Sequence, residues 1–354
     1  MKLVLRSGAV TAAVGVGLSV AVLPAVPANA TGGTHVRCND ITALKKAINF
    51  ANTHPNTGPI TLASNCTYNL TSPDNADDGL PEITGSDVTI SGRNTTIRRA
   101  PTATQDFRIL HVLNGGRLTL NSLTIRDGSL SSGGSGGGIA NQQGGTLKLN
   151  RSVVRSNEAG FGGGLANLGG RLDLSRSTVE RNTASTWGGG ITNDSSGTMT
   201  MKGGSLRENR SGSIGGGLEN INGTASMEDV SVRDNVSTTG GGIRNVNGST
   251  VRLKSSTVRE NIAVSGAGIS NFGSGSTVTL VRSTVTRNTA INTGGGILNE
   301  AGGQVTLTAS RVVRNSPDNC APEGSVPGCS NPTGTVAPPS SAKLPPAADI
   351  KAGK

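Results

Sequence analysis

The chain has 354 residues, of which 33% are hydrophobic, 2% are aromatic and 53 are glycine. Its formal net charge is +10, which favours acidic partners such as polysaccharides, teichoic-type polymers and lipid headgroups. Nucleic acid is excluded as a partner, because the chain has only four Phe, one Tyr and one Trp to stack on bases, and its basic residues are scattered.

The first 30 residues have the composition of an export signal. Lys2 and Arg6 provide a positive start, an apolar run follows over residues 9–26, and Ala28-Asn29-Ala30 supplies the small residues that a signal peptidase recognises. Cleavage there removes two basic residues and leaves a mature chain of net charge +8 that begins near Thr31. No later stretch approaches the roughly 18 apolar residues of a spanning helix. The sequence therefore predicts a secreted or cell-surface protein whose mature chain has no transmembrane segment.

Four cysteines remain after export: Cys38, Cys66, Cys320 and Cys329. An even number in an exported chain favours disulfides, and their order predicts one local pair at each end, Cys38 with Cys66 and Cys320 with Cys329. A metal site is the weaker interpretation, because the three histidines of the chain show no ligand spacing. No bound metal is expected.

Residues 31–85 are expected to form an N-terminal cap and the first coil. Residues 42–51 have the one convincing helical pattern of the chain, with Asp40 as the cap and an apolar side that includes Leu44 and Ile48. The end of a repeat array exposes its core and unpaired strand edges. An amphipathic helix at this point would cover that end.

An internal repeat organises residues 86–330. A glycine-rich block, an aliphatic residue, any residue and an asparagine recur seven times, at intervals of 25 to 28 residues. The asparagines of this motif are Asn141, Asn167, Asn193, Asn220, Asn245, Asn271 and Asn299. A second segment, of the form Ser-x-Val-x-x-Asn, ends at Asn157, Asn182, Asn209, Asn235, Asn261, Asn288 and Asn315. Upstream the pattern is less regular, and Asp127 is expected at the asparagine position of its coil.

Each unit also contains a short segment of alternating apolar residues, such as Leu172-Asp173-Leu174. A period of two in segments this short indicates strands. Three short strands in roughly 26 residues, each with one inward face, are typical of one coil of a parallel β-helix. We therefore expect an all-β parallel β-helix of about ten coils. Inward aliphatic columns would form its core, and asparagine ladders would satisfy backbone groups at its corners.

Residues 331–354 are rich in Pro, Ala, Ser and Lys and are expected to form a flexible tail. The coil that ends at Asn315 has no evident cap in the sequence, so stacking on a second copy is an open alternative. The sequence does not decide the oligomeric state.

The strongest catalytic candidates form a charged column on one outer face. Directly before the corner asparagines of three consecutive coils stand Glu208, Asp234 and Glu260. Each of them follows an arginine: Arg207, Arg233 and Arg259. Carboxylates stacked about 5 Å apart repel one another, so the pKa of one should rise, which a retaining glycosidase or a calcium-dependent lyase could exploit. The alternative is a solvated face on which each carboxylate is balanced by its arginine. The three arginines are candidate ligand-binding residues.

Three further groups of side chains are considered as possible sites. Phe161 and Trp187 precede the glycine block in adjacent coils, where they would stack on a sugar ring or form a hydrophobic corner. A loop flanked by Pro and Gly contains Asp74, Asp77, Asp78 and Glu82. This loop is either a weak calcium site or a solvated loop. Beside the first set of asparagines, and too separated for a catalytic dyad, stand Asp194, Glu219 and Glu300.

The motifs resemble those of secreted right-handed parallel β-helix proteins of the pectate-lyase-like superfamily. Gly163-Gly164-Leu165 and Val179-x-x-Asn182 are similar to the Gly-Gly-aliphatic and x-x-Asn repeats of polymorphic outer membrane proteins. The stretch from Cys38 to Asn52, with Cys66-Thr67-Tyr68, looks like the cap ahead of many such helices. The resemblance covers about residues 36–330 and implies a right-handed β-helix. It does not imply one activity, since the superfamily mixes polysaccharide lyases, hydrolases, adhesins and proteins of no known activity.

The regularity of the repeats favours a non-catalytic protein, because active sites on β-helices usually need irregular loops that form a groove. The sequence therefore predicts a secreted or cell-surface β-helix protein that binds polysaccharide, such as an acidic or cell-wall polymer, or that mediates adhesion. The alternative is an extracellular polysaccharide lyase or glycosidase. No cofactor is expected, and calcium only if the protein is a lyase.

Overall fold

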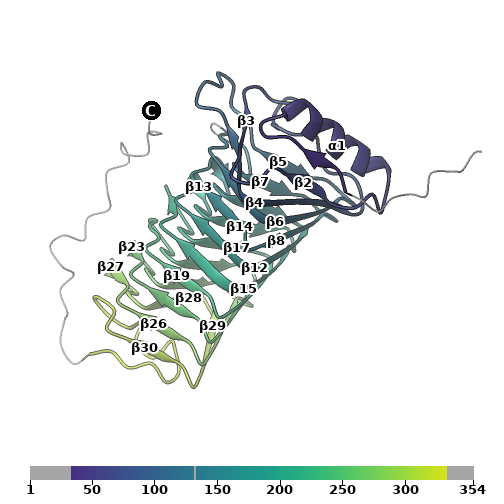
Figure 1. Cartoon of the computed structure of the whole chain (residues 1–354). Coiled ribbons are helices and arrows are strands. Elements are labelled where there is room, and N and C mark those ends of the chain that lie inside the picture. The colour runs from purple at the N-terminus through teal and green to yellow at the C-terminus, as the bar shows by residue number, and fades with distance from the viewer. Residues whose placement is uncertain (1–32, 131–132, 333–354) are drawn as a thin grey trace, which may run out of the picture. The chain divides into compact units, whose positions relative to one another are not determined.

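The computed structural model describes residues 33–130 and 133–332, and this part of the chain contains one α-helix and a parallel β-helix of about eleven turns (Figure 1). The expected all-β fold is confirmed, with about one turn more than the repeats suggested. The predicted export signal, residues 1–30, and residues 333–354 of the predicted tail lie outside the described residues. Within the described ranges, no helix has the length and apolar character needed to cross a membrane.

Each turn contributes to two main sheets and, at one corner, to smaller ones. Within the described residues, the 17-stranded sheet contains β1 (His35–Val36), β2 (Ile60–Leu62), β3 (Thr67–Leu70), β4 (Val88–Arg99), β6 (Arg117–Arg126), β8 (Thr146–Asn150), β9 (Val153–Arg155), β12 (Arg171–Glu180), β15 (Thr198–Arg207), β18 (Thr224–Glu228), β19 (Ser231–Arg233), β21 (Thr250–Lys254), β22 (Thr257–Arg259), β25 (Thr277–Val281), β26 (Thr284–Thr286), β29 (Gln304–Thr308) and β30 (Arg311–Val313). The nine-stranded sheet contains β5 (Leu110–Val112), β7 (Ile139–Asn141), β11 (Leu165–Leu168), β14 (Ile191–Asp194), β17 (Leu218–Ile221), β20 (Ile243–Val246), β24 (Ile269–Phe272), β28 (Ile297–Glu300) and β31 (Cys320–Ala321). The corner sheets contain β10 (Glu158–Phe161), β13 (Thr183–Trp187) and β16 (Arg210–Ser211), and β23 (Ile262–Ser265) with β27 (Thr289–Thr293).

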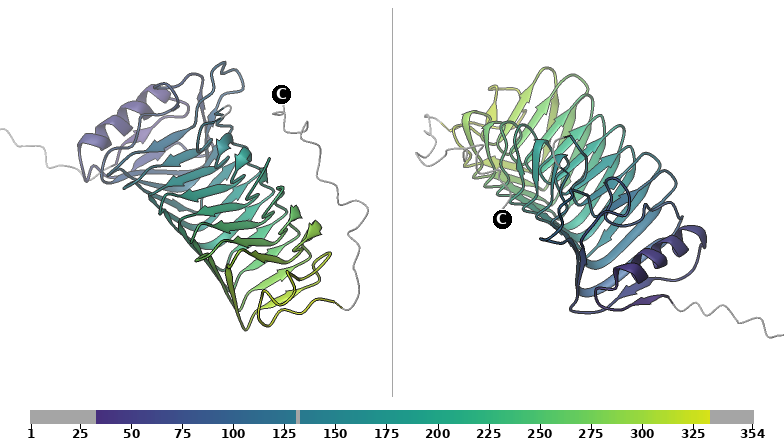
Figure 2. Two further views of the ribbon diagram at one scale, coloured as in Figure 1. Left: turned by 180° about the vertical axis from the view of Figure 1, so that it is seen from behind. Right: turned by 90° about the horizontal axis from the view of Figure 1, so that it is seen from above.

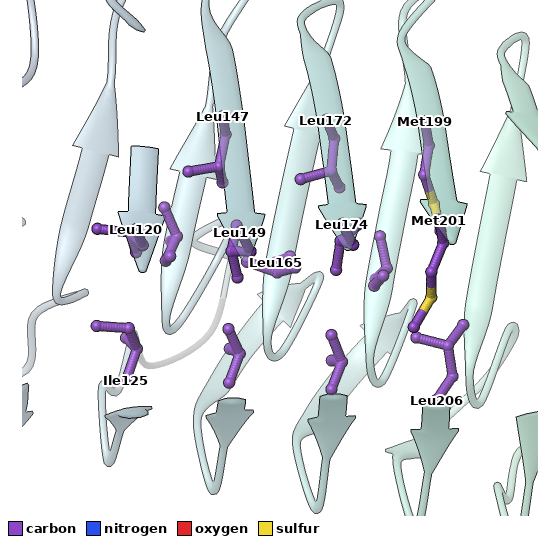
Figure 3. Packing of buried hydrophobic residues seen from close by; sticks show 14 of the residues in the cluster. Leu120, Ile125, Leu147, Leu149, Leu165, Leu172, Leu174, Met199, Met201 and Leu206 are labelled. Atoms are coloured by element: carbon purple, nitrogen blue, oxygen red, sulfur yellow. The ribbon is translucent and has the colours of Figure 1, made fainter. Parts of the chain in front are cut away.

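Strands of successive turns pair in parallel, so equivalent residues lie above one another (Figure 2). Leu120, Leu149, Leu174 and Met201 form one such column and are all buried (Figure 3). Their neighbours along each strand face outward, as the period of two predicts. Burial of each such side chain contributes about 1.5–3 kcal/mol. Stacked columns of this kind give the solenoid a continuous core despite its few aromatic residues.

Two ladders of buried asparagines line the corners, and every asparagine expected in them is buried. In one ladder, the Asn182 side-chain amide donates to Asn209 Oδ1 and to the Val154 carbonyl, each at 3.0 Å. The backbone N–H of Asn182 donates to the same Oδ1 at 3.1 Å. In the other ladder, Asn141 Nδ2 donates to Asn167 Oδ1 at 2.7 Å. The predicted ladders are confirmed, and they satisfy backbone groups that turn away from the sheets.

Asp127 does not take a ladder position, so that expectation is wrong. Arg126 stands opposite Arg155, which sets Asp127 opposite Ser156. Gly128 follows, and its backbone N–H donates to Asn157 Oδ1 at 2.9 Å. A glycine therefore begins this ladder, one residue later than the irregular upstream sequence suggested.

The N-terminal turn is covered as expected. Helix α1 (Ile41–Thr53) begins after Asp40, whose Oδ1 accepts a hydrogen bond from the Ala43 backbone N–H at 2.9 Å. Leu44 and Ile48 are fully buried on its inner side. A disulfide joins Cys38 to Cys66, as the order of the cysteines predicted. The cap therefore seals the first turn with apolar side chains and a covalent link.

The C-terminal turn is also covered, so the expectation of an uncapped coil after Asn315 is wrong. Asn319 Oδ1 continues the ladder by accepting from the Asn315 backbone N–H at 3.1 Å, and β31 pairs with β28. The predicted disulfide between Cys320 and Cys329 closes a loop in which Val326 is buried. Both disulfides are consistent with an oxidising, extracellular location.

Replacement of Asn209 by alanine is expected to lower the free energy of unfolding by roughly 2–4 kcal/mol, because the buried N–H groups of Asn182 lose their acceptor. Urea unfolding would measure the loss. Thr224→Ala, an exposed change on the next turn, is the control and should cost less than about 0.5 kcal/mol. Equal losses in the two variants would contradict a stabilising role for the ladder.

Candidate functional site

Six arginines and one glutamate form a column on the outer face of the 17-stranded sheet. They stand opposite one another on consecutive turns, in the order Arg98, Arg126, Arg155, Glu180, Arg207, Arg233 and Arg259. We call these residues the arginine column. The structure brings together the three predicted arginines and adds three more upstream of them. Adjacent strands lie about 4.8 Å apart, so the column repeats a positive charge at about that interval on most of its turns.

The three predicted carboxylates lie beside the arginine column, at a corner of the turn. Glu208, Asp234 and Glu260 have positive φ angles of 56°, 56° and 57°. Each contacts the arginine that precedes it in the sequence: Arg207, Arg233 and Arg259. The structure therefore places the predicted acidic and basic residues together, as pairs along one edge.

Glu208 is the most constrained of these carboxylates. Arg181 Nε lies 2.6 Å from its Oε2, and Arg207 Nη1 lies 2.5 Å from its Oε1. The hydrogen bond from Arg181 is the main reason that the pKa of Glu208 lies below its ordinary value. The rise in pKa expected for stacked carboxylates therefore does not occur at Glu208. A lowered pKa suits an ion pair and opposes a role as general acid.

Phe161 and Trp187 do meet at the corner, as predicted. They stand opposite each other on β10 and β13, with ring centroids 5.1 Å apart and ring planes at 65°. Both side chains are half-buried. An edge-to-face pair stabilises a corner, but it does not present two coplanar faces to a sugar ring.

A buried polar cluster lies at the N-terminal end of the nine-stranded sheet, where the loop before β4 crosses β5. Arg108 Nε lies 2.7 Å from Asp78 Oδ1. His111 Nδ1 lies 3.2 Å from Asp78 Oδ2 and 3.8 Å from Glu82 Oε1. We call Asp78, Glu82, Arg108 and His111 the N-terminal polar cluster. Asp78 is only 2% exposed and His111 only 7%, whereas Asp74 and Asp77 are exposed and Glu82 is partly exposed, so the acidic loop is solvated except at Asp78.

Burial alone would raise the pKa of Asp78. The hydrogen bond from His111 and the positive charge of Arg108 outweigh this effect and hold the pKa below its ordinary value. The carboxylate is therefore ionised over the whole neutral range. Sequence reasoning placed Asp78 and Glu82 in one acidic loop but missed His111, which lies 33 residues from Asp78.

Glu219, which the sequence analysis names with Asp194 and Glu300 beside the first set of asparagines, has an environment that the sequence did not reveal. It is fully buried on β17, and neither of its carboxylate oxygens has a hydrogen-bond partner among the described residues. Burial raises its pKa to about 8, and the charge of Asp194 adds to this effect while Arg244 opposes it. Gly215 lies over the carboxylate, where a Cβ atom would come within 2.7 Å of Oε2. The glycine block therefore covers this side chain and excludes it from solvent.

A groove of about 420 Å³ lies over the first strands of the 17-stranded sheet. Its polar lining includes Asn56, Asp87, Arg117, Thr119 and Lys148. This lining contains no histidine or cysteine and none of the predicted acidic candidates. The groove therefore adds no catalytic arrangement.

No family model matches the chain, and no curated protein matches it. Among solved structures, the chain is similar to the A-module of mannuronan C-5 epimerase AlgE6 from Azotobacter vinelandii. The sequence identity is 13% and the TM-score 0.38, over 80% of this chain and 94% of that chain. A likeness this distant does not carry the epimerase activity over to this chain. The parallel β-helix fold rests on the strand pairing described above.

Glu219→Gln is expected to stabilise the protein at pH 7 by roughly 3 kcal/mol. Below pH 4.5 the carboxyl is largely protonated in both the folded and the unfolded chain, so its ionisation does not lower the stability there. As the pH rises toward 8, the unfolded chain loses this proton more readily, so the wild-type stability falls. Urea unfolding of both proteins across this range measures the difference.

Glu300→Gln is the matched control, since Glu300 is an exposed carboxylate on the same sheet. This variant should follow the wild-type pH profile. If the stability difference between Glu219→Gln and wild type did not grow with pH, the buried carboxyl would not be the cause.

Proposed function

We propose that this chain is an exported β-helix protein that binds an acidic polysaccharide along the arginine column without modifying it. The observation that carries the proposal is the column itself, in which six arginines are held in register on one sheet and only the turn of Glu180 interrupts them. A polymer with one acidic group per sugar repeats its negative charge along its length. A rigid array of cations with a short repeat is complementary to such a polymer.

The arginines are held in place but retain free donors. Arg207 contacts Glu180 and Glu208, Arg233 contacts Asp234, and the two arginine side chains are each 27% exposed. A guanidinium has five N–H donors, of which each carboxylate uses at most two, so at least one donor remains on Arg207 and three on Arg233. Among the described residues, no ion pair involves Arg155. The carboxylates therefore orient the guanidinium groups, and the remaining donors face solvent, where a polymer carboxylate or sulfate can accept them.

The location fits this function. The N-terminal pattern indicates export, and the two disulfides suit an oxidising compartment. A net positive charge on the mature chain favours association with acidic polymers outside the cell. Because the core columns and the arginine column share one register, the binding face is preorganised, which lowers the entropic cost of binding.

A lyase or glycosidase is the weaker alternative. Its proposed acid would be Glu208, Asp234 or Glu260, and each of these contacts an arginine. At Glu208 the hydrogen bond from Arg181, with a further one from Arg207, lowers the pKa, whereas a general acid needs a raised pKa. This observation supports binding over catalysis.

The test is retention of the purified mature protein on immobilised polyuronate, with a neutral glucan as reference. Wild type should bind the polyuronate, release as salt rises, and produce neither reducing ends nor unsaturated product. The triple variant R207Q/R233Q/R259Q should lose affinity by roughly tenfold, because it lacks three solvent-accessible charge contacts with the polymer. Retention of full affinity by this variant, or the appearance of product, would overturn the proposal.

The matched control is R252Q/R282Q/R311Q, which removes the same charge from nearby turns but from exposed arginines outside the column. If binding depends on the column, this variant should stay within about twofold of wild type. Equal losses in the two triple variants would show that net charge alone attracts the polymer.

A further inference from the structure

The N-terminal polar cluster brings together two carboxylates and an imidazole, the side chains that bind zinc and similar ions. One ligand atom from each of Asp78, Glu82 and His111 lies within 4.8 Å of the other two. We propose that these three side chains bind one divalent transition-metal ion of the zinc type. The site lies on a different sheet from the arginine column, and the proposal does not depend on polysaccharide binding.

The distances fit a metal of this size. Zinc bonds to nitrogen and oxygen at about 2.0–2.2 Å, so two ligand atoms of a tetrahedral site lie about 3.3–3.6 Å apart. His111 Nδ1 lies 3.2 Å from Asp78 Oδ2 and 3.8 Å from Glu82 Oε1. All three ligand atoms lie within 4.8 Å of one another, so the Glu82 carboxylate has to approach the other two by up to about 1 Å to reach the tetrahedral separation. Its side chain is 40% exposed, so this movement leaves the core undisturbed.

The charges also fit a divalent cation. Asp77, Asp78 and Glu82 carry three negative charges, and Arg108 balances one of them. Two negative charges then remain while His111 is neutral, the form in which histidine binds metals. Arg108 holds Asp78 Oδ1 and leaves Oδ2 directed at His111. Asp78 would therefore bind through one oxygen, in an orientation that Arg108 enforces.

The burial of His111 is a second, independent observation. The residue is only 7% exposed, and its Nδ1 atom faces Asp78 and Glu82. Its Nε2 atom, on the other side of the ring, is buried without a hydrogen-bond partner among the described residues. The fold therefore places one buried imidazole nitrogen, Nδ1, against two carboxylates, and the partly exposed Glu82 side chain gives an ion access.

The ligand set favours zinc over calcium. Calcium takes six to eight oxygen ligands, whereas an imidazole nitrogen with two carboxylates suits zinc and its neighbours. The acidic loop does not supply the missing oxygens, because Asp74 instead forms an ion pair with Lys45 at 3.2 Å. We therefore favour a zinc-type site that includes His111 over the calcium site that the sequence suggested for this loop.

The test is zinc titration of the purified, metal-free mature protein by calorimetry, together with thermal unfolding. Wild type should bind about one zinc per chain and unfold at a higher temperature with zinc. Glu82→Gln and His111→Gln should each lose at least about tenfold in affinity. Since Glu82 is partly exposed, its variant should keep the wild-type melting temperature without metal, which separates lost ligation from misfolding.

His54→Gln is the control, because His54 is an exposed histidine outside the cluster. It should bind zinc as wild type does. The proposal is overturned if wild type does not bind zinc, if Glu82→Gln binds it with wild-type affinity, or if calcium binds more tightly than zinc.

Discussion

The structure depends on one constraint, the parallel hydrogen bonding of each turn to the next. Parallel strands alone cannot meet this constraint, because the backbone leaves the sheets at every corner and would bury unpaired groups there. The asparagine ladders supply the missing partners: Asn182 uses its side chain and its backbone N–H on the same oxygen of Asn209. Because the backbone groups at the corners then have hydrogen-bond partners, successive turns stack. The aliphatic columns, the arginine column and the corner carboxylates all follow from this stacking.

The asparagine ladders and Glu219 differ in how far their buried polar groups are satisfied. In the ladders each side-chain amide nitrogen has an acceptor, as between Asn182 and Asn209, and only Asn141 Oδ1, at the first turn of its ladder, lacks a partner among the described residues; such networks rigidify a fold. Glu219 is buried on the nine-stranded sheet without a hydrogen-bond partner among the described residues and has a pKa of about 8. Near neutral pH this carboxyl is therefore largely protonated. The regular stacking on both sides of it offsets the cost of this one unsatisfied group.

The fold was predictable because its determinants are periodic in the sequence. Paired asparagines such as Asn193 and Asn220, alternating aliphatic residues and the capping helix all carry local signals that need no knowledge of contacts. The ends were harder to predict, because the glycine that begins a ladder at Gly128 and the asparagine that continues it at Asn319 lie outside the regular spacing. A shift of one residue there was enough to misplace Asp127.

The candidate sites were only partly predictable, for the same reason. Arg207, Arg233 and Arg259 follow from the repeat, whereas Arg98 and Arg126 lie on upstream turns whose register only the strand pairing reveals. Contacts between Asp78, Arg108 and His111 arise where an irregular loop crosses β5, and no period connects residues of that kind. The burial of Glu219 depends on the glycine block that covers it, which a linear pattern does not show.

The repeated structure of the arginine column determines how its length can change during evolution. Each turn touches only its two neighbours, so the gain or loss of a repeat leaves the remaining turns intact. Under the binding proposed above, every added repeat of this type would extend the arginine column by one cation without redesign of the core. Affinity for a long polymer then depends on valency, since contacts on one rigid rod act together. Tandem duplication is thus a route by which this architecture can tune its avidity in small steps.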